Sequence, residues 1–196
     1  MARIPLPSPA EMTPEQRAVH NSVVSGPRGV MIGPLRAAIH SPDIAARWSA
    51  FGEALRFNTT LPKRLNELAI IVTGRRWTAQ IEWWVHAKAA AAAGLPEGVI
   101  AAIRDGAPPV FDDPDDASVY EFARQLGQTG TVAPAVYAAV TERWGARGCV
   151  ELVAVIGYYT LVAMTLNVHE VPLPDGVEPP LVPTGDTLLI DLPPAR

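Results

Sequence analysis

A chain of 196 residues is long enough to bury one full hydrophobic core, and 48% apolar residues with a net charge of −4 are typical of a globular protein. Its 16 Lys and Arg residues are scattered without a basic run, which argues against nucleic-acid binding. No membrane-spanning run is expected, because small and polar residues interrupt the most apolar stretch, from Glu151 to Asn167. The N-terminus has no apolar signal core and the single Cys149 cannot form an intrachain disulfide, so we expect a cytoplasmic protein.

Proline-rich segments flank a region with helical patterns. Residues 1–12 are predicted to form an extended N-terminal arm and residues 171–196 a proline-rich C-terminal tail, because repeated prolines prevent helix formation. Within the tail, Leu188–Leu192 is apolar enough to pack as a short strand or an arm, on its own subunit or on a neighbour. Residues 13–170 are predicted to form a single all-α domain, since no linker divides them.

The helical region opens at Thr13–Gln16, which combines a capping box with proline at the first helical position. Periodic apolar residues and start signals predict the later helices over 41–56, 62–75, 79–93, 97–104, 113–125, 134–144 and 149–168. A helical bundle follows from this order of elements.

A helical hairpin is predicted at the centre of the chain. Pro62 suits the first turn of its first helix, Thr78 is an N-cap candidate for the second, and Gly94 is a stop signal. The turn lies between Arg75 and Thr78, so the two helices should pair antiparallel.

This hairpin brings ionisable residues together in apolar surroundings. Glu67 and His86 lie almost equally far from the turn and should face each other across it. Glu82 precedes His86 by four residues, so both occupy one helix face and are able to interact directly. Buried carboxyl and imidazole groups usually have a partner or a function.

Structural explanations exist for each of these residues. Glu67 is able to pair with Arg64 or Arg75 and only hold the hairpin together, and Glu82 is able to form a salt bridge with Arg76 or Arg147. A histidine on an apolar face is often a core residue. Two carboxylates and an imidazole would also suit a transition metal.

The spacing of the hairpin resembles the carboxymuconolactone decarboxylase superfamily, which also contains the alkyl hydroperoxidase D-type peroxidases. Glu67 is followed at intervals of 12, 3 and 4 residues by Ala79, Glu82 and His86. The peroxidase branch carries cysteines at the two middle positions, so the acid and the histidine are in register while both redox cysteines are missing. The resemblance continues in Gly33-Pro34, His40–Ala45, Ala93–Ile103 and Glu151–Pro174.

The resemblance implies an all-helical fold with a central antiparallel hairpin, assembled as a homo-oligomer, a trimer or hexamer. It implies no cofactor and no metal, and as the reference reaction the decarboxylation of 4-carboxymuconolactone, a step in aromatic compound catabolism. In this interpretation His86 is the catalytic acid/base, Glu67 its relay, and Glu82 either catalytic or an orienting group.

Several residues are candidates for binding a small, anionic substrate. Arg28, in the loop before Pro34, would clamp a carboxylate. The others would form an aromatic wall or reach the site from the last helix: Trp83, Trp84, Tyr158 and Asn167. Packing is the alternative for the aromatic residues, and backbone capping for Asn167.

Three classes of function therefore remain. A carbon–carbon lyase of decarboxylase type is the class that the resemblance implies. A ligand-binding or non-catalytic protein that kept the fold is the main alternative. A thiol peroxidase is disfavoured, because it needs a nucleophilic and a resolving cysteine, and Cys149 is alone.

Overall fold

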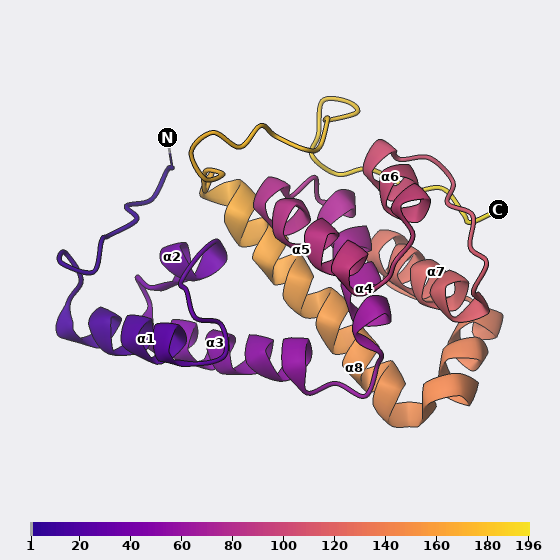
Figure 1. Cartoon of the computed structure of the whole chain (residues 1–196), viewed down its shortest axis with the longest axis horizontal. Helices are drawn as coiled ribbons and strands as arrows, with labels where there is room; N and C mark the ends of the chain where they lie inside the picture. Colours follow the sequence, from indigo (N-terminus) through magenta and orange to yellow (C-terminus); the bar gives the residue numbers. More distant parts are fainter. Residues whose placement is uncertain (1) are drawn as a thin grey trace. The chain divides into compact units, whose positions relative to one another are not determined.

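The structure of the protein, a computed structural model, describes residues 2–196. The regular secondary structure within this range is entirely helical. Within this range no β-strand forms, so the predicted all-α fold class is confirmed and Leu188–Leu192 is an extended arm. The helices are α1 (Pro14–Ser25), α2 (Pro34–Ala38), α3 (Pro42–Phe57), α4 (Lys63–Arg76), α5 (Gln80–Ala92), α6 (Glu97–Asp105), α7 (Pro114–Thr129) and α8 (Pro134–Val168) (Figure 1).

The described residues group into two compact units. One comprises the chain up to Asn58 together with Thr165–Pro172, and the other Thr59–Met164 with Leu173–Arg196. The first contains α1, α2 and α3, and α3 packs against both of the others. The capping box predicted at Thr13 is present, with reciprocal hydrogen bonds between Thr13 and Gln16 at 3.3 and 3.0 Å.

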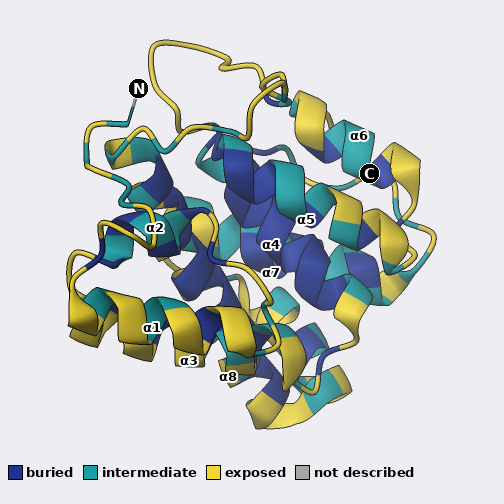
Figure 2. Ribbon diagram, turned by 60° about the vertical axis from the view of Figure 1, so that its left-hand side comes forward, coloured by how far each residue is buried: buried dark blue, intermediate teal, exposed yellow. Residues whose placement is uncertain are grey.

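Helix α4 is the core of the second unit. Every residue from Leu65 to Arg75 is buried, including polar ones, because α5 and α7 pack along it and α6 contacts it as well. The dark central helix in Figure 2 shows this burial. A helix buried on all sides places even its polar side chains in a medium of low polarity.

The turn between α4 and α5 differs from its predicted chemistry. Ala79, not Thr78, occupies the N-cap position of α5, and it makes no side-chain cap. Thr78 instead has a φ of 47°, a left-handed conformation that reverses the chain at a cost of about 1–3 kcal/mol. Its hydroxyl accepts a hydrogen bond of 3.0 Å from Arg75 Nη1, and the Ala79 amide donates to the Gly74 carbonyl at 2.8 Å. Pro62 likewise precedes α4 as its N-cap rather than lying in its first turn.

Helix α5 ends as predicted. Gly94 has a φ of 91°, which a residue with a side chain rarely adopts. The amides of Leu95 and Gly94 donate to the carbonyls of Ala90 and Ala91, which is the hydrogen-bond pattern of a Schellman motif. The stop at Gly94 fixes the length of the hairpin's second helix.

Helix α8 has the length and apolar composition of a membrane span, contrary to the sequence expectation. Half of its most apolar stretch is buried within the protein, as in the core helix of a globular fold. A non-helical residue, Gly145, with φ 66° and ψ −176°, separates its first part from the remainder. This break corresponds to the two helices predicted over 134–144 and 149–168.

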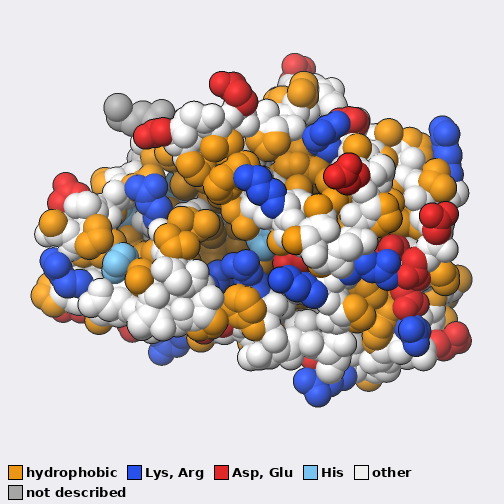
Figure 3. Space-filling model, in the orientation of Figure 1, with side chains coloured by type: hydrophobic (Ala, Val, Ile, Leu, Met, Phe, Trp, Pro, Cys, Tyr) orange, Lys and Arg blue, Asp and Glu red, His pale blue; other side chains and the backbone are white. Residues whose placement is uncertain are grey.

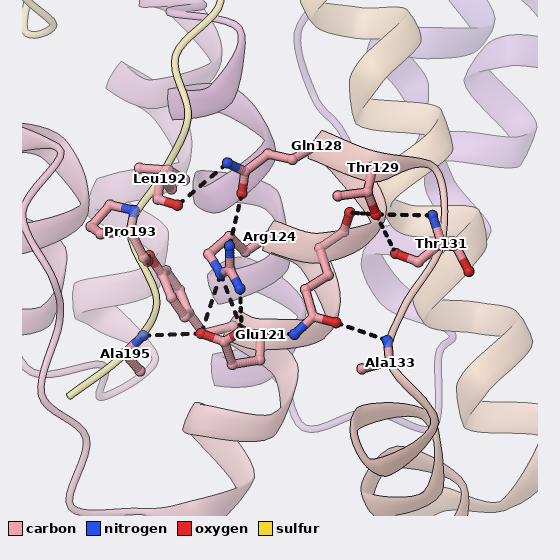
Figure 4. A network of polar contacts seen from close by, with 11 residues as sticks. Glu121, Arg124, Gln128, Thr129, Thr131, Ala133, Leu192, Pro193 and Ala195 are labelled. Atoms are coloured by element: carbon pink, nitrogen blue, oxygen red, sulfur yellow. Dashed lines mark hydrogen bonds and ion pairs between the residues drawn. The ribbon is translucent and has the colours of Figure 1, made fainter.

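The C-terminal tail packs on its own chain, one of the two alternatives left open by the sequence. Leu181, Ile190 and Leu192 are buried, and the Ile190 amide donates to the Arg76 carbonyl at 3.0 Å. Figure 4 shows the end of the tail along α7, where Glu121 accepts from the Ala195 amide at 2.9 Å. The tail therefore covers the end of α4 and one side of α7.

Candidate active site

A buried hydrogen bond joins the two helices of the hairpin. His86 on α5 and Glu67 on α4 contact each other through Nδ1 and Oε2, 2.7 Å apart, and only 6% and 3% of these residues is exposed. The predicted facing of the two residues is therefore observed. The alternative partners of Glu67 bind elsewhere: Arg64 pairs with Asp113 and Asp116, and Arg75 donates to Thr78 and to the Val182 carbonyl.

The contact with Glu67 orients the imidazole. When a carboxylate is the partner it only accepts hydrogen bonds, so Nδ1 is then the donor in this contact. In the neutral ring with a proton on Nδ1 the lone pair belongs to Nε2.

An aromatic residue that the sequence interpretation did not assign to the site packs against His86. The Tyr159 ring on α8 packs edge-on against the imidazole, with ring centroids 4.8 Å apart and an interplanar angle of 82°. Tyr158, a predicted substrate-binding residue, is buried and packs against Tyr159 at 5.3 Å. The adjacent tyrosines in an apolar helix were the available signal, but helical spacing alone did not show which one faces the hairpin.

Glu82 is buried without a hydrogen bond. It is 2% exposed, and neither carboxyl oxygen has a hydrogen-bond partner within residues 2–196. The predicted direct contact with His86 is therefore wrong. So are the alternative salt bridges, because Arg76 binds Asp191 and the Ile190 carbonyl while Arg147 binds Glu151.

Gly74 of α4 provides the space for the Glu82 carboxyl group. A methyl group at Gly74 would lie 3.0 Å from Oε1 of Glu82 and 3.4 Å from its Cγ. Burial raises the pKa of Glu82 well above its ordinary value, because a charged carboxylate here would lose its hydration without compensation. Burial without a hydrogen-bond partner therefore favours the neutral form of Glu82 over the charged one.

The other predicted binding residues have different surroundings. Trp83 is buried in the second unit, whereas Trp84 is half-buried and stacks under Lys88, whose Nζ lies 4.2 Å from the ring centroid. Arg28 and Asn167 belong to the first unit, where both are half-buried. The binding roles of these residues stay predictions.

The side chains of Glu67, Glu82 and His86 do not converge as metal ligands would. Among the described residues, no group of three or more His, Cys, Asp or Glu side chains has such an arrangement. Cys149 lies buried in α8 as a free thiol. On the face drawn in Figure 3, Lys and Arg side chains alternate with acidic and apolar ones rather than forming one basic field.

No protein-family model matches the chain, and no curated protein matches it in sequence. Solved structures match in fold. A peroxidase-related protein from Ralstonia eutropha JMP134, described as an alkylhydroperoxidase AhpD core, superposes with a TM-score of 0.70 at 18% identity, over 89% of this chain and 93% of that one. A peroxidase-related protein from Silicibacter sp. TM1040 gives 0.68 at 13% identity, over 87% and 91%.

A third structure with this fold is a debrominase, Bmp8. Its cysteine-to-alanine variant in complex with 2,3,4-tribromopyrrole superposes with a TM-score of 0.64 at 10% identity, over 83% of this chain and 87% of that one. These similarities show that the chain has the alkyl hydroperoxidase D-like fold, as the hairpin pattern predicted.

Proposed function

We propose that this chain, which has the alkyl hydroperoxidase D-like fold, is a cofactor-independent acid–base enzyme of decarboxylase type, acting on a small carboxylated lactone or related ring. The observation that carries the proposal is the buried hydrogen bond of 2.7 Å between His86 and Glu67. A histidine oriented by a carboxylate, in apolar surroundings, is a common arrangement for proton transfer to carbon.

The proposed reaction consumes one proton in each turnover. The bond between the ring carbon and the substrate carboxylate breaks, its electron pair moves toward the lactone carbonyl, and carbon dioxide leaves. Protonated His86 then gives its Nε2 proton to the carbon of the resulting enolate. Glu67 stabilises the imidazolium before this transfer and holds the ring in place after it.

The cysteine content weighs against a dithiol peroxidase. The chain has a single cysteine, and Cys149 lies in α8, whereas the resemblance places redox cysteines at the positions of Ala79 and Glu82. A peroxidase of that type needs a thiolate and a second thiol to resolve it. The debrominase of the same fold, in complex with a brominated pyrrole, supports a small flat ring as the kind of molecule this chain binds.

The test measures carbon dioxide release from a panel of lactone acids that includes 4-carboxymuconolactone. In heavy water, the carbon next to the lactone carbonyl, where the enolate is protonated, should acquire deuterium. Glu67→Gln and His86→Gln should each lower turnover by roughly 10²- to 10⁴-fold, and the double variant should be no slower than the slower single variant, because the two groups act as a unit.

His20→Gln is the matched control, since His20 lies on α1 and contacts only the neighbouring Asn21 among the hydrogen bonds described. Its turnover should equal that of the wild type. Turnover near the wild-type rate in both single variants would remove the pair from the mechanism. A wild-type protein that binds ring acids but converts none of them would support a ligand-binding role instead.

A further inference from the structure

Helices α4 and α5 meet at two successive positions along the hairpin, the Glu67–His86 hydrogen bond and the close approach of Glu82 to Gly74. Glu67 and Gly74 are seven residues apart on α4, so they share one face. Glu82 and His86 are four apart on α5 and also share a face, with a rise of about 6 Å between them. The Gly74–Glu82 contact nearer the turn is therefore next to the Glu67–His86 hydrogen bond.

The carboxyl groups of Glu67 and Glu82 are similarly buried, but they have different partners. At one position the carboxyl of Glu67 has a ring nitrogen as its partner. At the other position the carboxyl of Glu82 faces the backbone of Gly74 and has no hydrogen bond on either oxygen. A buried carboxyl in this condition costs about 1–3 kcal/mol of stability relative to a hydrogen-bonded one.

A second cost is present at the same place. Glycine inside a helix is less stable than alanine by about 1 kcal/mol, and Gly74 lies inside α4. Alanine at this position would crowd the Glu82 carboxyl. An apolar side chain at position 82 would pack here without either cost, so two destabilising residues in contact indicate a functional reason.

The arginines at the same end of α4 as Gly74 bind groups other than Glu82. Arg75 and Arg76, on the same end of α4 as Gly74, bind Thr78, the C-terminal tail and Asp191. On α8, Tyr159 packs edge-on against His86, and Tyr158 packs against Tyr159. His86 is the basic residue four positions from Glu82 on the same buried face of α5, and its cationic form would balance a charge on Glu82.

We propose that Glu82 is the proton reservoir of the site: a neutral carboxylic acid at rest that reprotonates His86 after His86 has given its proton to the substrate carbon. This role rests on the proposed decarboxylation. The Glu82 O–H bond breaks, its proton goes to Nε2, and a carboxylate remains beside the new imidazolium. Solvent then returns the proton to Glu82, so that each turnover takes up one proton for one carbon dioxide released.

Because Glu82 and His86 are not hydrogen-bonded in this structure, the transfer proceeds through a water molecule or by rotation of the Glu82 side chain. In the proposed step the carboxylate of Glu82 and the imidazolium of His86 form together, so the proposal requires that the two groups titrate as a coupled pair.

The test uses infrared spectroscopy of the full-length protein, because a protonated carboxyl has a carbonyl band distinct from that of a carboxylate. A band present at neutral pH in the wild type and absent in Glu82→Gln identifies Glu82. Its titration midpoint is then measured in the wild type, in His86→Gln and in the control His20→Gln. His86→Gln should raise the midpoint by roughly one pH unit or more, and His20→Gln should leave it unchanged.

Absence of the band at neutral pH, or an equal midpoint in the wild type and His86→Gln, would overturn the proposal. The turnover arm compares Glu82→Met with Glu82→Gln, after cooperative unfolding has shown that both fold. Both should lose turnover, because neither supplies a proton. If the Glu67 and His86 variants are inactive while Glu82→Met is fully active, the proposed decarboxylation stands and the reservoir does not.

Discussion

The uncompensated burial of Glu82 makes the stability of the protein depend on pH in a defined direction. In the unfolded chain the carboxyl ionises near its ordinary pKa of 4.5, whereas burial keeps it protonated to a much higher pH in the folded protein. Between these two pKa values the folded state binds one more proton than the unfolded state. The free energy of unfolding must therefore fall as the pH rises through this window.

The size of this pH effect follows from the difference of one bound proton between the folded and the unfolded state. Each pH unit inside the window lowers the free energy of unfolding by about 1.4 kcal/mol, and the decline ends above the pKa of the folded state. Glu82→Gln keeps the shape of the side chain but removes the ionisable group, so this contribution disappears. Glu82→Met also removes the unpartnered oxygens and should add about 1–3 kcal/mol of stability.

The assay is urea unfolding of the wild type and of Glu82→Gln at a series of pH values from mildly acidic to mildly alkaline. Titrating groups that do not interact with Glu82 are common to both proteins, so their contributions cancel in the difference between the two free energies. The variant should gain on the wild type as the pH rises, with unchanged denaturant slopes. A difference that does not vary with pH would show that Glu82 ionises at its ordinary pKa and would refute this reasoning.

Three further predictions concern the tail, the thiol and the assembly. Leu192→Ala should lower the free energy of unfolding by about 2–5 kcal/mol, whereas Leu188→Ala, at a 44% exposed site, should change it by less than about 0.5 kcal/mol in the same urea assay. The protein should not reduce peroxides with a dithiol donor, and dithiol-dependent reduction that is lost in Cys149→Ser would contradict this. Light scattering should show that the wild type is a trimer or hexamer. Leu161→Glu should shift the molar mass toward that of the monomer, because Leu161 belongs to an exposed apolar stripe on α8. A monomeric wild type would contradict the predicted assembly. The stripe consists of Val150, Val153, Leu161 and Met164.

The hairpin and its central contact were predictable because they follow from spacing. Helical periodicity located both helices, and an antiparallel turn places residues at equal distances from it opposite each other. Glu67 and His86 satisfy that condition, and they are hydrogen-bonded. The end of α5 was predictable for a similar reason, since Gly94 adopts the positive φ that its stop requires.

Features that depend on side-chain direction or on the whole packing were not predictable. Spacing by four residues placed Glu82 near His86, but the contact with Gly74 shows that its carboxyl points across the hairpin instead. Thr78 has a side chain typical of an N-cap, yet the chain reversal requires it in a left-handed conformation. The apolar residues of the tail did not reveal whether they cover their own chain or a neighbour, because both would bury the same surface.

The proposed roles of Glu67 and Glu82 rest on a difference between the surroundings of two carboxyl groups in one hairpin. Both carboxyl groups are almost completely buried on the facing sides of adjacent helices, so burial alone does not distinguish them. The difference is the partner: an imidazole nitrogen for Glu67, and an unsubstituted glycine backbone for Glu82. Burial without a hydrogen-bond donor favours the neutral form of a carboxyl group, and it raises the pKa of Glu82. The proposed division of roles between the two carboxyl groups therefore depends on glycine at position 74 as well as on the acids themselves.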